Sequence, residues 1–169
     1  EYVNDAVVKL AAELTEDSRV KLIHAAGKRD YDRIRADWDA TAAGSCDRMT
    51  LVDYIYDMPD QMAAADLVIS RAGAMSISEL ALTGKAVVFI PSPYVAENHQ
   101  YKNAMALVNK EAAVCVEEKT LTEGALTATV KSLLDSPDRR AAMETRIRDF
   151  ACPDANERIY SALMGLIRP

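Results

Sequence analysis

The chain has 169 residues, and half of them are apolar, which is enough for one globular domain with a buried core. Asp and Glu number 26 against 20 Lys and Arg, so the formal net charge is −6. An acidic chain lacks the broad basic face of a nucleic-acid-binding protein. No apolar run approaches the ~20 residues of a membrane span, and the polar start from Glu1 to Asp5 does not resemble a signal peptide.

Helical and strand patterns alternate along the chain. The pattern predicts helices at 3–14, 30–38, 58–65, 75–82, 98–110, 122–134, 138–150 and 154–167. It predicts strands at 20–26, 50–55, 66–70, 86–90 and 113–116. Such alternation indicates an α/β, Rossmann-like parallel sheet covered by helices on both faces. Because doubly wound domains open with a strand and this chain opens with a helix, we expect a sheet without its first, central strand.

Three cysteines, Cys46, Cys115 and Cys152, are too few and too scattered for a disulfide framework or a zinc site. We expect three buried or half-buried free thiols in a reduced domain. The chain also lacks a P-loop, an HExxH pair and a GxSxG motif. We therefore expect no metal site, no cofactor and no catalytic residue in this chain.

The loop after the predicted strand at 66–70 is the most informative. Arg71 to Ser76 joins a buried strand to a helix, and ligands of open parallel sheets bind beyond the carboxyl ends of the strands. Small residues allow close approach, and free N–H groups at a helix start bind anions. This pattern predicts a phosphate site, although one glycine is a weaker signal than a dinucleotide fingerprint and a plain turn would look the same.

Two further features lie at the same edge of the sheet. Glu79 lies one helical turn after Ser76, where a carboxylate can accept the hydroxyls of a ribose, or can be merely solvated. The loop at 91–100 brings His99 and neighbouring amides to a helix start, which suits sugar hydroxyls. The alternative there is that Asn98 caps the helix and His99 is simply exposed. His24 stands in a strand without a readable partner, and we expect it to be structural.

Two stretches, ADLVISRAGAMSISE at 65–79 and ENHQYKNA at 97–104, are similar to the donor-binding domain of the MurG family. Shorter matches at 54–58 and 84–86 extend the resemblance to essentially the whole chain. The family transfers N-acetylglucosamine from its UDP derivative to a lipid-linked muramyl-pentapeptide. The resemblance implies the C-terminal half of a GT-B fold, with 1–169 as a single nucleotide-sugar donor-binding domain.

The resemblance also implies how the donor would be held. Ile55 matches the position whose backbone reads the uracil edge, and Glu79 matches the acid on the ribose hydroxyls. His99 and Gln100 match a polar pair that reaches the sugar hydroxyls and phosphates.

The remaining matched positions surround the phosphates. Ala74, Met75 and Ser76 match the helix start beside the diphosphate and the sugar. Arg71 and Gly73 match the turn that shapes the pocket. The nine matched residues are thus expected to bind substrate, and none of them to supply the catalytic base.

The family pattern places the acceptor with an N-terminal domain that this sequence does not contain. The resemblance therefore implies a metal-independent, inverting hexosyltransferase in the full-length protein, with this fragment inactive alone. It implies a cytoplasmic protein, peripheral at the inner face of the bacterial membrane, with membrane contact mainly through the absent half.

Two other functions fit the same residues less well. A stand-alone nucleotide-sugar-binding subunit of a split N-acetylglucosaminyltransferase would be expected to keep its first strand. A sugar-nucleotide epimerase of similar architecture matches less closely at the ENHQ loop. An oxidoreductase is disfavoured because the dinucleotide fingerprint is missing.

Overall fold

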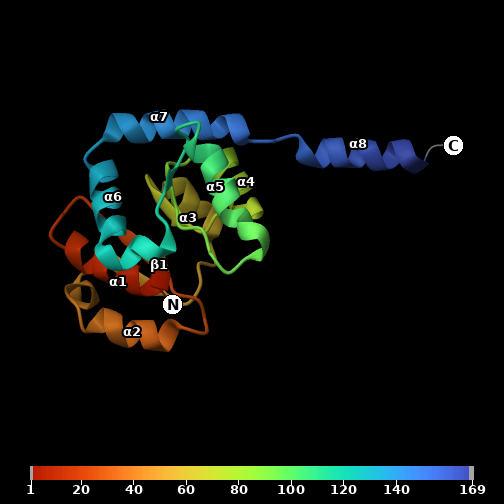
Figure 1. Cartoon of the computed structure of the whole chain (residues 1–169). Helices are drawn as coiled ribbons and strands as arrows, with labels where there is room; N and C mark the ends of the chain where they lie inside the picture. Colours follow the sequence, from red (N-terminus) through yellow and green to blue (C-terminus); the bar gives the residue numbers. More distant parts are fainter. Residues whose placement is uncertain (1, 168–169) are drawn as a thin grey trace.

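The computed structural model describes residues 2–167, without the side chains of Thr122 and Glu123. The α-helices are α1 (Tyr2–Leu14), α2 (Tyr31–Asp39), α3 (Met58–Ala64), α4 (Ala74–Thr83), α5 (His99–Val108), α6 (Ala125–Leu134), α7 (Pro137–Ile147) and α8 (Ala155–Ile167) (Figure 1). The strands are β1 (Leu22–Ala25), β2 (Met49–Val52), β3 (Val68–Ser70), β4 (Val87–Phe89) and β5 (Val114–Cys115). Short 3-10 turns are η1 (Ala42–Ser45), η2 (Ala96–Asn98), η3 (Glu118–Glu123) and η4 (Arg148–Phe150).

The described strands are all parallel, but they form two sheets instead of one. β1 pairs with β2, and β3, β4 and β5 form a second sheet in that order. Within the described residues no ladder joins the two sheets. The α/β architecture is therefore confirmed, and the break is what a parallel sheet without a central strand would show.

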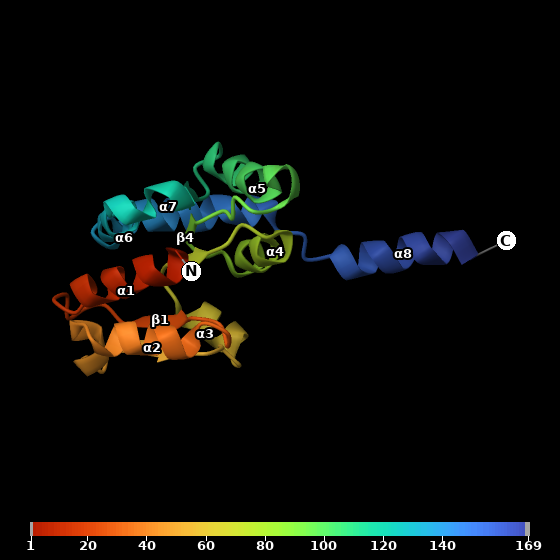
Figure 2. The ribbon, with the colours of Figure 1, turned by 60° about the horizontal axis from the view of Figure 1, so that its bottom comes forward.

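Helices cover both faces of the three-stranded sheet, as its sequence pattern requires. Val88 and Ile90 face a core shared with α1, α2 and α6, which includes Leu10. Val87 and Phe89 face a second core, built with α4, α5 and α7. Since successive side chains of a strand point to opposite faces, this alternation makes β4 buried on both sides. Figure 2 shows the two helix layers around it.

The strands are shorter than the sequence pattern predicts, and the second strand, β2, has different bounds from the predicted ones. It covers Met49–Val52 rather than 50–55, so Ile55 lies in a loop beyond the strand and not at its end. Just beyond the strand, the carboxylate of Asp53 accepts a hydrogen bond from the Tyr54 N–H at 2.8 Å, a local side-chain bond typical of turns.

Several predicted helix boundaries need correction. The helix expected at 98–110 begins at His99, because Glu97 and Asn98 are left-handed, with φ of 52° and 53°. Asn98 makes no side-chain cap, so the capping interpretation is wrong. The helix expected at 122–134 begins at Ala125, and the one expected at 138–150 is divided into α7 and η4. Gly84 ends α4 with a φ of 64°, as predicted.

The last helix, α8, extends away from the rest of the molecule (Figures 1 and 2). None of its residues is buried, and Ile159, Tyr160 and Leu163 are all more than half exposed. Within residues 2–167, no helix combines the length and the apolar character that crossing a membrane requires.

Candidate functional site

The candidate site lies at the carboxyl edge of the three-stranded sheet, where three loops begin side by side. The Ile90 N–H donates to the Ser70 carbonyl at 2.8 Å, which aligns the ends of β3 and β4. The Val116 N–H donates to the Phe89 carbonyl at 2.9 Å, which does the same for β4 and β5. Residues far apart in the sequence therefore leave the sheet at one place.

Arg71 connects these three loops through its guanidinium group. One terminal nitrogen, Nη1, donates to the Ile90 carbonyl at 3.1 Å. The other, Nη2, lies 2.6 Å from the Glu118 carboxylate oxygen Oε2. The Glu118 side chain is 7% exposed, against 38% for Arg71. Sequence reasoning singled out Arg71 but missed Glu118, whose one signal was its place two residues after a predicted strand.

Helix α5 is fixed to the same edge by two amide side chains. The Nδ2 amide of Asn103 donates to the Ala72 carbonyl at 3.2 Å, which joins α5 to the loop after β3. The Oε1 oxygen of Gln100 accepts from the Ser92 N–H at 2.9 Å, which joins α5 to the loop after β4. His99 is exposed, with Nδ1 3.0 Å from the Ala96 carbonyl. The predicted polar pair therefore stands beside the loop that contains Arg71.

The N-terminus of α4 opens at this edge. Gly73 occupies the N-cap position and offers no side-chain cap, and the first backbone bond of the helix runs from the Ile77 N–H to the Gly73 carbonyl at 3.0 Å. The N–H groups of Ala74, Met75 and Ser76 precede that bond, so they have no partner within the helix. They carry the positive end of the helix dipole, which favours an anion.

The two sides of α4 differ as the sequence predicted. Leu80 and Ala81 are buried against the sheet. Glu79 is exposed one turn beyond Ser76, on the side away from the core. A carboxylate thus stands about one turn from the unpaired N–H groups, which is the order needed for a ribose next to a phosphate.

Ile55 is the one predicted site residue on the other sheet. It is half-buried in the loop after β2, between two exposed aromatic rings. The rings of Tyr54 and Tyr56 meet edge to face at 5.1 Å, and the Lys28 ammonium lies 5.7 Å from the centre of the Tyr56 ring. The other eight predicted residues lie along the β3–β4–β5 edge, and their binding roles remain predictions.

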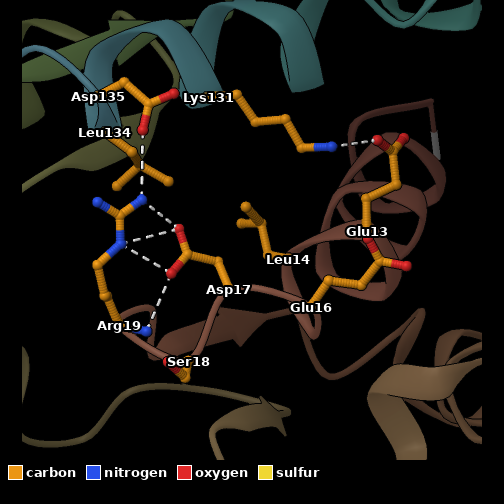
Figure 3. Close-up of a pocket in the computed structure, with 9 residues that line it drawn as sticks. All are labelled: Glu13, Leu14, Glu16, Asp17, Ser18, Arg19, Lys131, Leu134 and Asp135. Carbon is orange, nitrogen blue, oxygen red and sulfur yellow. Dashed lines mark hydrogen bonds and ion pairs between the residues drawn. The ribbon is translucent and has the colours of Figure 1, made fainter.

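The opposite edge of the sheets carries a pocket of about 420 Å³ that includes none of the predicted residues (Figure 3). Its lining is Glu13, Leu14, Glu16, Asp17, Ser18, Arg19, Lys131, Leu134 and Asp135. The Arg19 guanidinium lies 2.6 Å from Asp17 and 3.2 Å from Asp135, and Lys131 lies 2.7 Å from Glu13. Hydrogen bonds from Arg19 lower the pKa of Asp17 to about 2. These charges satisfy one another rather than converge on a ligand.

His24 is structural, as predicted, but it does have partners. Its Nε2 lies 3.1 Å from the Asn4 oxygen Oδ1, and its ring stacks on Trp38 with centroids 6.4 Å apart. Burial lowers the pKa of His24 to about 4, so the imidazole is neutral at pH 7.

All three cysteines are free, as predicted. Cys152 is exposed, which corrects the expectation of three buried or half-buried thiols. Burial, together with the nearby Glu117 carboxylate, raises the pKa of Cys115. Over residues 2–167, no cluster of three or more His, Cys, Asp or Glu is arranged to hold a metal ion.

Comparison with known proteins gives a consistent picture. The UDP-N-acetylglucosamine–N-acetylmuramyl-(pentapeptide) pyrophosphoryl-undecaprenol N-acetylglucosamine transferase of Paraburkholderia phymatum is 36% identical over 157 residues. That match covers 93% of this chain and 42% of the relative. The transferase of the same name from Acetivibrio thermocellus is 34% identical over 168 residues, or 99% of this chain and 45% of the relative. The chain thus spans less than half the length of these relatives.

Solved structures agree with the sequence matches. The crystal structure of Acinetobacter baumannii MurG superposes with a TM-score of 0.78 at 26% identity, over 95% of this chain and 46% of that one. The glycotransferase of kitacinnamycin superposes with a TM-score of 0.59 over 86% of this chain and 34% of that one. At 19% identity this second likeness concerns the fold alone. The family model "Glycosyltransferase family 28 C-terminal domain" matches residues 1–159. The chain belongs to glycosyltransferase family 28, and it corresponds to the family's C-terminal domain.

Proposed function

We propose that this chain binds UDP-N-acetylglucosamine, as the donor domain of an inverting hexosyltransferase that makes the lipid-linked disaccharide precursor of peptidoglycan. The family assignment and the names of the two relatives support this activity. In those relatives, more than half of the protein lies outside the matched region. The acceptor, a muramyl-pentapeptide on a lipid pyrophosphate, is therefore assigned to a further part of the full-length protein.

The observation that carries the proposal is the arrangement around the start of α4. Three loops and α5 are tied together by Arg71 and Asn103, and the unpaired N–H groups of residues 74–76 open beside them. A diphosphate fits this positive end, with the ribose toward Glu79 and the sugar toward His99. Ile55, on the neighbouring sheet, would take the uracil end.

The proposed chemistry uses these groups to stabilise a leaving group. During transfer the bond between the sugar anomeric carbon and the diphosphate oxygen breaks, and UDP gains negative charge. Fixed N–H groups and a helix dipole stabilise such charge without reorganising. The acceptor hydroxyl forms the new bond from the opposite face, and its proton passes to a base outside this chain. The proposed role of this chain is thus to hold the donor and to accept the charge of the departing UDP.

The proposal also places the full-length protein at the inner face of the bacterial cell membrane, since the acceptor is lipid-linked. The contact would be peripheral, and it would lie mainly in the part of the protein that binds the acceptor. This chain would then face the cytoplasmic pool of nucleotide sugar.

Calorimetric titration with UDP-N-acetylglucosamine, UDP, UDP-glucose and ADP tests the proposal. We expect uridine-selective binding, with the N-acetylglucosamine derivative preferred to UDP-glucose. The same titrations on a version lengthened at its N-terminus to the size of the curated relatives serve as the reference. If neither version binds a uridine nucleotide, the proposal is contradicted. Transfer by this chain when it is mixed with a separate acceptor-binding chain would favour the alternative of a split enzyme.

A further inference from the structure

Glu118 is an acidic side chain buried at the edge of the sheet. With 7% of its side chain exposed, it has lost most of the solvation of a carboxylate. Its Oε2 atom is buried and makes no aligned hydrogen bond, although the Arg71 nitrogen Nη2 lies 2.6 Å away. A buried carboxylate is tolerated only when an opposite charge compensates it, so Glu118 and Arg71 constrain each other.

The position of Arg71 matters because its backbone leads into the start of α4. Ala72 comes next, with its carbonyl held by Asn103, and Gly73 then opens the helix. Gly73 has no close packing of its own: a side chain there would meet nothing nearer than the Ser76 hydroxyl at 3.9 Å. Ala72 is fully buried, so the turn is held by this packing, by the Asn103 amide and by the contacts of the Arg71 side chain.

We propose that Glu118 is a positioning residue of the donor site: it holds the Arg71 guanidinium, and through it the 71–73 turn that aims the N-terminus of α4. The carboxylate itself does not touch the nucleotide. This inference rests on the proposed function for its ligand, but the mechanical link between Glu118 and α4 does not. The two can therefore be tested separately.

The chain offers a matched control one residue away. Glu117 is also ion-paired, to Lys119 at 3.0 Å, but both side chains are exposed, at 44% and 74%. Glu118→Gln and Glu117→Gln thus make the same chemical change at adjacent positions, and only the first removes a charge that faces Arg71. Glu118→Asp, which keeps the charge and shortens the reach, is the second variant if Glu118→Gln fails to fold.

The first readout needs no ligand. We expect Glu118→Gln, or Glu118→Asp in its place, to speed amide hydrogen exchange at residues 77–80, the first hydrogen-bonded amides of α4, at least fivefold. Glu117→Gln should change this exchange less than twofold. The amides of α1 provide the internal reference for global stability. Unchanged exchange at residues 77–80 in the Glu118 variant would overturn the proposal, whatever the ligand measurements give.

The second readout separates positioning from a general loss of structure. UDP should bind about tenfold more weakly to Glu118→Gln, while uridine, which lacks the diphosphate, should change less than twofold. In a protein that already carries Arg71→Gln, adding Glu118→Gln should weaken UDP affinity by less than a further twofold, because the two residues act through one contact. If the losses of UDP affinity in the two single variants multiplied in the double variant, the proposal would be overturned. Failure of the unaltered protein to bind UDP would instead contradict the proposed function, and the exchange readout would still decide the role of Glu118.

Discussion

The two edges of the sheets use charge in different ways. At the amino edge, Asp17, Arg19 and Asp135 form an exposed network around a visible pocket (Figure 3). At the carboxyl edge, Arg71 ties three loops together and pairs with Glu118, whose carboxylate is largely withdrawn from water. Exposed pairs are screened by salt and contribute little to stability, whereas a buried carboxylate becomes costly when its partner is removed.

The difference is why we place the candidate site at the carboxyl edge and not at the pocket of the amino edge. Most charged side chains that line the pocket at the amino edge pair with one another. The carboxyl edge instead presents the unpaired N–H groups of a helix start, beside a carboxylate at Glu79 and an imidazole at His99. Ligand chemistry requires groups with unmet hydrogen-bonding capacity, and these lie at the second edge.

The largest expected effect is on the free energy of unfolding, and it comes from the half-buried His24, which lies between the two edges. Because the pKa of His24 is lowered from 6.5 to about 4 in the folded chain, the unfolded chain binds the proton first as the pH falls. Stability should therefore decrease between pH 6.5 and 4, by on the order of 3 kcal/mol at 1.36 kcal/mol per pKa unit. Urea denaturation across this range measures it.

The control for His24 is the other histidine. His24→Gln keeps a polar partner for Asn4 and cannot be protonated, so it should flatten the pH dependence. His99→Gln, at an exposed position, should leave it in place. Equal slopes in the two variants would show that burial of His24 does not control stability in this range.

The next effect compares the two edges directly. Arg71→Met leaves Glu118 buried without its partner, and we expect a loss of about 2–3 kcal/mol in the free energy of unfolding. Lys131→Met breaks the exposed Lys131–Glu13 pair and should cost less than about 1 kcal/mol. Urea denaturation of both variants at pH 7 gives the two values. Similar losses would remove the distinction drawn between the edges.

Glu79 tests the ribose role without affecting the core. A hydrogen bond from a neutral hydroxyl to a carboxylate contributes about 1.5–3 kcal/mol when it is desolvated, so Glu79→Ala should weaken UDP affinity by roughly 10- to 150-fold. Because the side chain is exposed, the melting temperature should hardly change. UDP affinity that stays unchanged in the folded variant would refute the ribose role.

His99 should produce a smaller and more selective effect. His99→Ala is expected to weaken UDP-N-acetylglucosamine by about 1 kcal/mol, or roughly fivefold, as for one neutral hydrogen bond. UDP alone should bind almost as before, since the imidazole is assigned to the sugar. Parallel titrations with both ligands decide it, and equal losses would speak against a sugar contact.

The smallest effect is expected at the amino edge. Asp17→Asn removes the carboxylate whose pKa Arg19 lowers to about 2. The contribution of this pair is present above pH 3.8 and is lost as the pH falls toward 2, and high salt should weaken it throughout. UDP affinity should be unaffected. A change in nucleotide binding would show that the pocket of Figure 3 takes part in the site.

Much of the fold could be predicted because the spacing of apolar residues along the sequence indicates which side chains are buried. The run at 86–90 is apolar because β4 lies between β3 and β5 and is buried on both faces. Gly84 ends α4 because glycine adopts a left-handed backbone at little cost. Boundaries set by backbone turns could not be predicted. The left-handed pair Glu97 and Asn98 shortened one predicted helix.

The candidate site was predicted only in part, for a similar reason. Glu79, His99 and Gln100 could be found from short-range spacing and resemblance. Glu118 could not, because its importance comes from burial against Arg71, which only the tertiary structure shows. The spacing places Asn103 one turn from His99 on the same polar face, but its bond to the Ala72 carbonyl depends on how α5 packs and could not be predicted.

The most direct test of the central claim is a two-dimensional NMR titration of the ¹⁵N-labelled protein with UDP-N-acetylglucosamine. We predict shifts concentrated at residues 71–79, at His99 and Gln100, and at the loop around Ile55, with the amides of residues 13–19 and 131–135 unmoved. Shifts that map to the amino-edge pocket, with residues 71–79 unchanged, would contradict a donor site at the carboxyl edge.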